Sequence, residues 1–336
     1  ALYSVAGSDR YIFRQADVCD ADRIAALVSG FAPDIITHLA AESHVSRSFL
    51  APGLFDRTNR LGTRSVMEGA LKAGVRLVLH VSTDEIYGTR FEPADENAPL
   101  NPSSPYSVSK AAAEAEALRA RQCGLDVRIV RPSNIIGTGQ HGEKLLPKFL
   151  GLCLSGQPFL LEGDGFQKRT FLPVQDFCNA VTRAVRHGAR CGTYNVCGRE
   201  TKTVREVARL IAEKCGRPLE FEHIEDRPVN DQAYAMDASR MAALGWRQEG
   251  SLAAEIDRMI ALHPLAQTAA TLAPQDRFLE RHAAQMQFHA PHRARKEQNL
   301  LAQVMSGQRF SGGGAFCGLA ESALEKMCKR LKSRVA

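Results

Sequence analysis

The sequence predicts an α/β protein built on a doubly wound parallel sheet, with a smaller mixed α/β region after it. Short apolar runs alternate with helix-like stretches as far as about residue 132, which indicates βαβ units. Two adjacent carboxylates, Asp84 and Glu85, follow one of these apolar runs. A tyrosine and a lysine, Tyr106 and Lys110, stand four residues apart near the start of a predicted helix.

The first predicted region, residues 1–132, alternates strands with helices. Gly74 and Gly124 each follow a helix-like stretch and are expected to end it. Pro105, after two serines, is expected to begin the longest helix. We expect strands at 11–15, 34–39, 76–82 and 126–130, and helices at 21–29, 61–73 and 105–122.

The second predicted region, residues 133–263, is expected to form a smaller mixed domain that caps the sheet, and the resemblance described below implies that it mainly binds the nucleotide sugar. Its helices are expected at 144–154, 174–186 and 204–215, and its strands at 170–172, 193–196 and 219–221. Residues 264–336 form a basic tail with a glycine run at 311–314. Within the tail, 321–335 fits either a solvated appendage or a basic helix that binds a partner.

Composition excludes several classes of function. The net charge is +6, and the tail alone carries eleven Lys and Arg against five Asp and Glu, so the remainder is neutral and nucleic acid is not an expected partner. No apolar run is long enough to span a membrane, and no secretory signal is visible. Nine scattered cysteines without a CxxC pair indicate reduced thiols in a cytoplasmic protein and no metal site.

The acidic pair stands where ligands bind in open parallel sheets, at the carboxyl end of a central strand. Neighbouring carboxylates in different environments can acquire different pKa values, so that one acts as an acid and the other as a base. Thr83, Asp84 and Glu85 are therefore candidate catalytic residues. The alternative is a helix N-cap with solvated acids, which is common.

Tyr106 and Lys110 share one face of the predicted helix. A neighbouring ammonium favours the phenolate, so we expect the pKa of Tyr106 to be lowered. A phenolate can accept a proton from a substrate hydroxyl while a hydride leaves the same carbon. A tyrosine and a lysine at this spacing also occur by chance on helix surfaces, so the pair alone is a weak signal.

A series of short motifs extends the signal along residues 5–262. In order, they are ADVCD at 16–20, HLAAESHV at 38–45, STDE at 82–85, SPY at 104–106 with Lys110, SN at 133–134, EKLLP at 143–147, Arg169, YN at 194–195 and RP at 227–228. This series resembles the extended short-chain dehydrogenases, and among them the dTDP-glucose 4,6-dehydratases. The resemblance implies a Rossmann-type fold with NAD as cofactor and a nucleotide-diphosphate sugar as substrate.

The resemblance also implies the catalytic roles. Tyr106 would deprotonate the C4 hydroxyl of dTDP-glucose as hydride leaves for NAD+, with Thr83 bonded to that oxygen and Lys110 holding the nicotinamide ribose. Glu85 would then remove the C5 proton, and Asp84 would protonate the departing C6 hydroxyl. Return of hydride to C6 gives dTDP-4-keto-6-deoxyglucose, so the enzyme would be a lyase.

Binding residues and an assembly are implied in the same way. Two long helices, at about 52–73 and 105–122, would form a homodimer. The cofactor-binding residues would be Asp17, Leu39, Ala40, Ala41, Thr58, Ser82, Tyr106 and Lys110. The substrate-binding residues would be Ser43, Thr83, Asn134, Lys144, Leu145, Arg169 and Asn230.

The sequence departs from the family pattern at its start. A strand, a GxxGxxG turn and a helix normally open such enzymes and bind the pyrophosphate, but no GxxGxxG occurs. By the family layout the chain begins about 45 residues late and lacks its first βαβ unit. Removal of a central βαβ unit should cost more than the roughly 5–15 kcal/mol that stabilises a typical domain. We therefore expect this chain alone to fold poorly and not to retain NAD+.

Smaller departures concern the substrate. Ser46 stands where the family usually has an aspartate, Glu162 where an aromatic is frequent, and Gln232 and Ala233 where basic residues are frequent. These residues leave the nucleotide open between dTDP and UDP or another. Two other functions also stay open, a related NAD-dependent epimerase or decarboxylase, and a non-catalytic remnant or a protein that acts through its tail.

Overall fold

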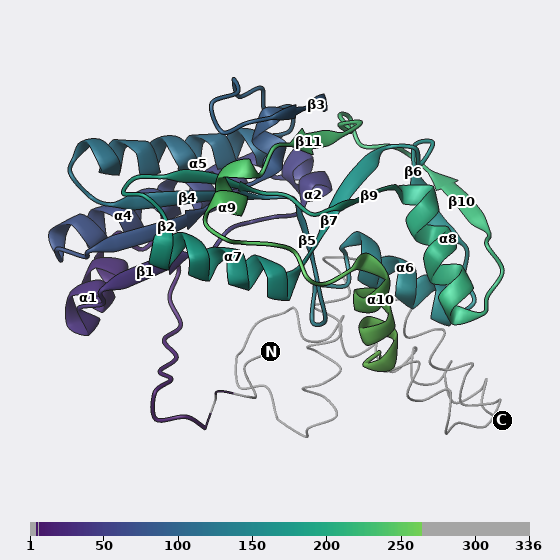
Figure 1. Ribbon diagram of the computed structural model, residues 1–336, viewed down its shortest axis with the longest axis horizontal. Helices are drawn as coiled ribbons and strands as arrows, with labels where there is room; N and C mark the ends of the chain where they lie inside the picture. The colour runs from purple at the N-terminus through teal and green to yellow at the C-terminus, as the bar shows by residue number, and fades with distance from the viewer. Residues whose placement is uncertain (1–4, 6, 264–336) are drawn as a thin grey trace, which may run out of the picture. The chain divides into compact units, whose positions relative to one another are not determined.

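The computed structural model describes Val5 and residues 7–263 (Figure 1). Its main sheet has four parallel strands in the order β1 (Ile35–His38), β2 (Leu77–Val81), β4 (Val127–Pro132) and β8 (Thr193–Val196). The predicted α/β class with a parallel sheet is confirmed. The basic tail, with its glycine run and its possible helix, lies outside the described residues.

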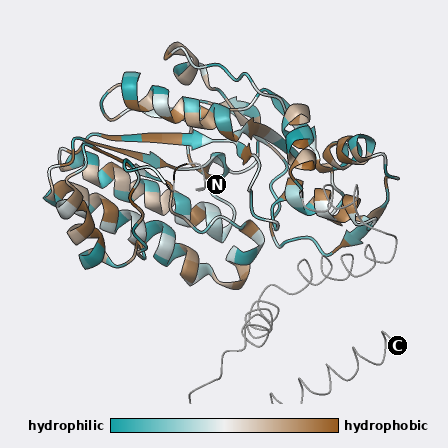
Figure 2. Ribbon diagram, turned by 90° about the horizontal axis from the view of Figure 1, so that it is seen from below, coloured by the Kyte–Doolittle hydropathy of each residue, from teal (hydrophilic) through white to brown (hydrophobic). Residues whose placement is uncertain are grey.

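Helices cover both faces of this sheet, because successive side chains of each strand point to opposite sides. Leu79 of β2 and Val130 of β4 pack against α7 (Val174–His187). Their neighbours Val78 and Ile129 pack against α4 (Gly62–Lys72) and α5 (Pro105–Gln122). The helices in Figure 2 accordingly carry both hydrophobic and hydrophilic residues.

The helical segment before β2 is longer than the 61–73 that the pattern predicted, and agrees with the 52–73 that the resemblance implied. It follows α1 (Ala21–Phe31) and α2 (Val45–Leu50), and begins with α3 (Pro52–Phe55). A π-helical stretch, η1 (Asp56–Leu61), leads into α4, and the later helix at Asp84–Tyr87, η2, is a 3₁₀ turn. A π-turn has no sequence signature in the helical period, which explains the missed start.

Most residues beyond 132, together with β3, form smaller sheets and helices beside the main sheet. A three-stranded sheet has the order β5 (Asn134–Ile136), β7 (Lys168–Pro173), β9 (Glu200–Thr203). Two two-stranded sheets pair β6 (Phe159–Glu162) with β10 (Phe221–Ile224), and β3 (Arg90–Ala94) with β11 (Tyr234–Met236). The remaining helices are α6 (Leu145–Leu154), α8 (Val204–Cys215), α9 (Ser239–Ala243) and α10 (Leu252–Ala261).

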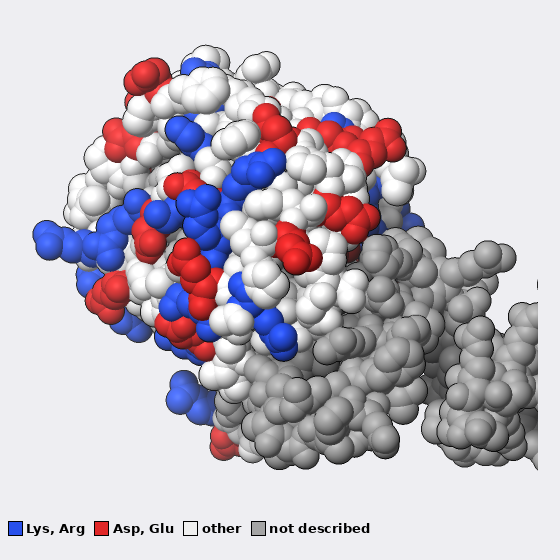
Figure 3. Space-filling view, turned by 90° about the vertical axis from the view of Figure 1, so that its right-hand side faces the viewer, with Lys and Arg blue, Asp and Glu red and all other residues white. Residues whose placement is uncertain are grey.

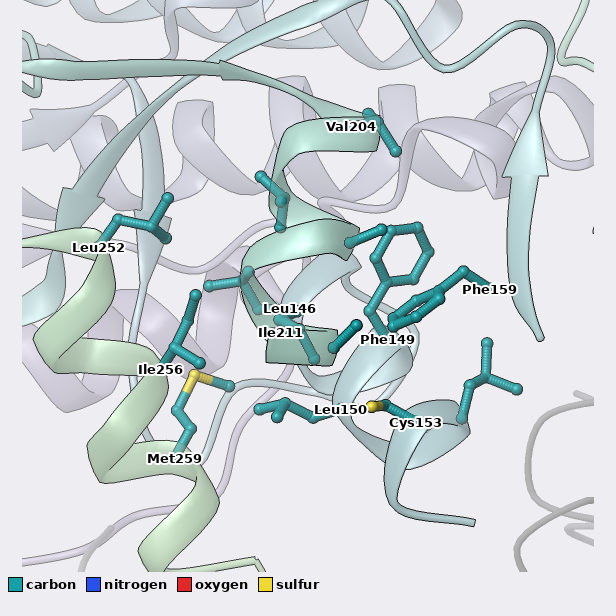
Figure 4. Packing of buried hydrophobic residues seen from close by; sticks show 14 of the residues in the cluster. Leu146, Phe149, Leu150, Cys153, Phe159, Val204, Ile211, Leu252, Ile256 and Met259 are labelled. Carbon is teal, nitrogen blue, oxygen red and sulfur yellow. The ribbon is translucent and has the colours of Figure 1, made fainter. Parts of the chain in front are cut away.

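A separate hydrophobic core holds most of these elements together, whereas α9 packs in the core of the main sheet, and β3 and β11 pack against η2. Phe149 of α6 meets Phe159 of β6 edge to face at 5.1 Å between ring centroids. Figure 4 shows Ile211 of α8 and Ile256 of α10 pointing into the same cluster. The second region is thus stabilised largely by its own apolar contacts, while β8 joins the sheet of the first. The domain boundary at residue 132 stays a prediction.

Several predicted bounds agree with the structure and others do not. The elements expected at 105–122, 193–196 and 204–215 have those bounds. The strand expected at 11–15 is wrong, because these residues are mostly exposed and pair with no strand in the described chain. A strand needs a neighbour to satisfy its backbone groups, which an apolar pattern alone does not supply.

The described residues contain no helix long and apolar enough to cross a membrane. On the face shown in Figure 3, basic and acidic side chains are interspersed, with no large area of one sign.

Candidate active site

A pocket of about 390 Å³ lies at the carboxyl ends of β1, β2 and β4. One wall comes from the residues that follow these strands together with the start of α5. Much of the remaining lining comes from α6, β6, β7 and Arg227. The main sheet and the second group of elements therefore both contribute to it, as expected for an open parallel sheet.

Most of the predicted site residues line this pocket. The catalytic candidates that do so are Thr83, Asp84, Glu85, Tyr106 and Lys110. The binding candidates that do so are Leu39, Ala41, Ser43, Ser82, Asn134, Lys144, Leu145 and Arg169. Four others, Asp17, Ala40, Thr58 and Asn230, are not among the lining residues.

The acidic pair is presented by the short turn η2. Thr83 is extended, and its Oγ1 accepts a hydrogen bond from the Glu85 N–H at 3.3 Å and donates to Asp84 Oδ1 at 3.1 Å. Gly88 ends the turn at φ 66°, where a Cβ would lie 2.3 Å from the Asn101 carbonyl oxygen. Only glycine fits there, so this turn holds both acids at the end of β2.

The alternative interpretation required an N-cap with solvated acids. Thr83 does cap η2, but Asp84 is buried and Glu85 is half-buried. Asp84 is 2% exposed and its Oδ2 has no hydrogen-bond partner within the described residues. Burial, reinforced by the charge of Glu85, raises the pKa of Asp84 to about 8. Burial also raises the pKa of Glu85, whereas Arg169 acts in the opposite direction. Asp84 therefore keeps its proton at neutral pH and can act as an acid.

Tyr106 and Lys110 are buried at the start of α5, with 8% and 5% of their surface exposed, so they are not a chance surface pair. Ser104 and Ser107 form a capping box that fixes where this helix begins. Lys110 Nζ donates to the Val81 carbonyl oxygen at 2.6 Å, which ties the helix to the end of β2.

The expected lowering of the Tyr106 pKa is wrong for this pocket. Burial, and then the negative charge of Glu85, raise the pKa of Tyr106. Burial lowers the pKa of Lys110 to about 8, with Glu114 acting in the opposite direction. The ammonium is bonded to the backbone of β2, while the carboxylates face the phenol. The desolvation of the phenol therefore outweighs the helical neighbour.

Cations also line the pocket, and we call Lys144, Arg169 and Arg227 its basic wall. Arg169 donates to the Asp231 carbonyl at 2.9 Å and to Asn230 Oδ1 at 3.0 Å, and its guanidinium lies 4.8 Å from the centre of the Tyr234 ring. Asn230 thus holds a lining residue without lining the pocket itself. Fixed guanidinium groups of this kind suit phosphate oxygens.

Three further cations, Lys144, Lys148 and Arg227, line the pocket with Arg169. Arg227 pairs with Glu162 at 3.0 Å, and Lys144 Nζ donates to the Ser43 carbonyl oxygen. Arg169, Arg227 and Lys144 all lower the pKa of Glu85, so their charges reach the acidic end.

The residues near Lys110 fit the nicotinamide half of a dinucleotide. Ser82 Oγ is buried without a partner in the described residues, and an ammonium has three donors of which the Val81 bond uses one. Asp17, by contrast, is exposed and pairs with Arg57 at 3.0 Å. No group of three or more His, Cys, Asp or Glu in the described part of the chain is arranged to hold a metal ion.

Sequence reasoning missed several lining residues. Gln140 donates to the Ile135 carbonyl at 2.9 Å, but its Oε1 is buried and unpartnered within the described residues. Gln167 and Lys148 also line the pocket. The signal available for Gln140 was a polar residue inside the glycine-rich stretch 137–142, directly after a strand.

One protein-family model and several curated relatives match this chain. The model of the NAD dependent epimerase/dehydratase family matches residues 2–197, which is more than half of the chain. A dTDP-glucose 4,6-dehydratase of Streptomyces griseus is 40% identical over 244 residues, covering 71% of this chain and 73% of that protein. One of Neisseria gonorrhoeae is 37% identical, with 73% and 79% covered.

Solved structures agree with these relatives. The dTDP-glucose 4,6-dehydratase DesIV of Streptomyces venezuelae, with NAD and TYD bound, is 35% identical and superposes with a TM-score of 0.74, covering 77% of this chain and 81% of that one. A UDP-glucose 4-epimerase of Thermus thermophilus in complex with NAD is 28% identical, with a TM-score of 0.69 and 74% and 84% covered. The chain therefore belongs to the NAD dependent epimerase/dehydratase family, in the group of the dTDP-glucose 4,6-dehydratases.

Proposed function

We propose that the protein is a nucleotide-sugar 4,6-dehydratase that converts dTDP-glucose to dTDP-4-keto-6-deoxyglucose. One observation carries the proposal: a buried carboxyl with a raised pKa, Asp84, stands beside a second carboxyl and a tyrosine in one pocket. An epimerase has no use for an acid and a base at this place, since it eliminates nothing. The curated relatives named above are dTDP-glucose 4,6-dehydratases.

The first task of the protein is to remove the proton from the C4 hydroxyl. Tyr106 accepts that proton and Thr83 donates a hydrogen bond to the same oxygen. Because burial and the charge of Glu85 raise the pKa of Tyr106, a positive charge entering the pocket will lower it. Bound NAD+ would supply that charge and the chemistry of taking up and returning a hydride, and Lys110 and Ser82 would hold its ribose end.

The second task is elimination of water across C5 and C6. The C4 ketone makes the C5 proton acidic, and Glu85 removes it. Asp84 gives its proton to the C6 hydroxyl, which leaves as water. The division of labour follows the pKa of Asp84, which is raised to about 8 and keeps the proton available at neutral pH.

The diphosphate is proposed to bind the basic wall. Arg169 is fixed by Asn230 and by the Asp231 carbonyl, so its guanidinium loses little freedom on binding. Arg227 and Lys144 add two charges on the same wall. With the sugar at the acidic end and the diphosphate at the basic wall, the nucleoside extends toward Glu162 and Lys148.

The direct test is to incubate the full-length protein with NAD+ and dTDP-glucose, and to measure the mass of the product. Loss of one water supports the dehydratase, whereas an unchanged mass with an altered sugar supports an epimerase. A parallel reaction with UDP-glucose shows whether the enzyme prefers dTDP or UDP as the nucleotide of its substrate. Failure of a folded, NAD+-binding preparation to change either substrate would contradict the proposal.

Two finer statements accompany this proposal. A homodimer through the helices at 52–72 and 105–122 is supported by exposed apolar side chains there, among them Leu54 and Val108. Light scattering of the purified protein tests it. A cytoplasmic location is supported by the seven cysteines of the described residues, which are all free thiols.

A further inference from the structure

Two charged side chains that line the pocket have no part in the proposed chemistry. Glu162 is the last residue of β6, and Lys148 lies on α6. Burial lowers the pKa of Lys148, so its ammonium has lost part of its hydration. A partly dehydrated charge is costly unless polar groups face it, which indicates that the ligand brings such groups to this place.

The charges of the pocket show where this pair stands relative to the acids. Arg227 lowers the pKa of Glu85 at the acidic end, and it also lowers the pKa of Lys148. Glu162 raises the pKa of Lys148, but it is not among the principal charges that act on Glu85. Arg227 therefore stands between the acids and the pair. A diphosphate on the basic wall, with its sugar at the acids, directs the nucleoside toward Glu162 and Lys148.

The Glu162 carboxylate is held in place, and one of its oxygens stays open to a ligand. Arg227 Nε donates to Oε2 at 3.1 Å, and Arg227 Nη2 lies 3.0 Å from the same oxygen. Gln167 Nε2 donates to the Glu162 carbonyl oxygen at 3.2 Å, which holds the end of β6. Because both nitrogens of Arg227 use Oε2, Oε1 can accept a hydrogen bond from another donor, and a fixed acceptor loses little freedom on binding.

Cationic donors accompany this acceptor. Arg227 has Nη1 besides the two nitrogens that meet Glu162, and the ammonium of Lys148 has three N–H donors. This end of the pocket thus offers one acceptor together with donors on two different side chains. The complementary edge of a ligand has one N–H flanked by two oxygens.

Among the nucleobases, thymine and uracil have this edge, since their N3–H is flanked by two carbonyl oxygens. Cytosine has an unprotonated N3 at the same place, and its lone pair would face the Glu162 carboxylate, which is repulsive. Guanine has two adjacent donors beside one acceptor, and adenine has no ring N–H on its pairing edge. Only the imide edge of thymine and uracil matches all three groups.

We propose that Glu162, with Lys148 and Arg227, selects thymine or uracil by accepting the hydrogen bond of the pyrimidine N3–H. The proposal rests on the proposed function for the direction in which the nucleoside lies. It does not separate dTDP from UDP, because thymine and uracil share this edge and differ at C5. It does separate both from cytidine and purine nucleotides.

The experiment measures binding rather than turnover, with two ligands that differ only in this edge. dUDP and dCDP have the same sugar and the same diphosphate, so the ratio of their Kd values depends on the base alone. Titration calorimetry of the full-length protein with NAD+ present gives both constants. We expect dUDP to bind about 10–100-fold more tightly than dCDP, because dCDP turns a lone pair toward the carboxylate.

Two variants and a control assign the selection to Glu162. Glu162→Gln keeps the shape, but its amide can donate to cytosine N3 or accept from uracil N3–H, so the ratio should fall about tenfold. Glu162→Ala removes the acceptor and should bring the ratio near one. Glu222→Gln is the matched control, because Glu222 is exposed on β10 beside β6 and does not line the pocket. It should leave the ratio unchanged.

Equal binding of dUDP and dCDP by the wild type would overturn the inference, and so would binding of neither ligand. These two results require no variant to fold. An unchanged ratio in the folded Glu162 variants, or an equal change in Glu222→Gln, would overturn it as well. If the protein prefers dUDP but dehydrates no nucleotide sugar, the proposed function fails while the selection of the base stands.

Discussion

The two walls of the pocket are built in opposite ways. The acidic wall comes from one strand end and one helix start, β2 with η2 and α5, and is tied together by the bond from Lys110 to Val81. The basic wall gathers Lys144, Arg169 and Arg227 from three separated segments. The compact wall performs the chemistry in our proposal, while the dispersed wall binds the substrate, so damage to each should affect different kinetic constants.

The largest effect is expected at the phenol of the acidic wall. Tyr106→Phe removes the proton acceptor for the C4 hydroxyl and should lower kcat by about 10²–10⁴-fold. No reduced cofactor should form, as followed by near-ultraviolet absorbance in a single turnover. Tyr87→Phe is the control, because Tyr87 is also buried but bonds Asn195 and Arg131 outside the pocket. Normal cofactor reduction by Tyr106→Phe would contradict the role.

A nearly equal effect is expected one step later, at Glu85. Glu85→Gln keeps the shape but cannot accept the C5 proton, so turnover should fall by about 10²–10⁴-fold. Oxidation at C4 still proceeds, and reduced cofactor should therefore accumulate with the 4-keto sugar. Exposed Glu222→Gln serves as control. Normal release of dehydrated product by Glu85→Gln would assign the base elsewhere.

The pH dependence of kcat/KM should report the acidic wall as a whole, because this constant follows the protonation states of the free enzyme. Asp84 has a pKa of about 8 when buried beside Glu85, and Lys110 also loses its charge near pH 8. As pH rises, Asp84 loses the proton that it must donate and Lys110 loses its charge, so log kcat/KM should fall above about pH 8 with a slope of about −1 or steeper. A kcat/KM that rises through about pH 9 would contradict the assignment of Asp84 as the acid.

A moderate effect is expected on the basic wall. Arg169→Lys keeps the charge but loses the planar guanidinium that Asn230 holds in place. KM for the nucleotide sugar should therefore rise about tenfold while kcat changes little. Arg205→Lys is the matched control, since Arg205 packs over Phe166 and Phe221 outside the pocket. If Arg169→Lys lowered kcat and left KM unchanged, the two walls would not divide the work as proposed.

The same contrast explains how far the sequence could predict the structure. On the acidic wall, residues that lie close together in the sequence are enough to predict the site, because Asp84-Glu85 follows an apolar run and Tyr106 and Lys110 share a helix face. The direction of the Tyr106 pKa was nevertheless wrong, because burial and the charge of Glu85 come from the folded pocket.

On the basic wall, sequence distance hides the contacts. Arg169 meets Asn230 across 61 residues, and only the resemblance to a family suggested both. Glu162 pairs with Arg227 across 65 residues, and Gln140 became visible only through its unpartnered Oε1. Short strands such as β3 and β11 were missed because their three to five residues carry too little pattern.

The smallest effect is expected on stability, again at Asp84. Its pKa is near 3.8 in the unfolded chain and about 8 in the folded one, so the folded state binds more protons between these values. The contribution of Asp84 to the free energy of unfolding therefore falls as pH rises from about 4 to about 8, and it is constant above about pH 8. Asp84→Asn cannot ionise and escapes this loss.

Asp84→Asn should hence be more stable than the wild type by about 1–3 kcal/mol at pH 8, and nearly equal to it at pH 4. Denaturant unfolding at both pH values measures the difference. Asp176→Asn provides the contrast, because that buried carboxylate accepts hydrogen bonds from the Glu249 and Gly250 N–H groups and its loss should destabilise. If Asp84→Asn were equally destabilised at both pH values, Asp84 would be a structural acceptor like Asp176, and the acidic wall would lack its acid.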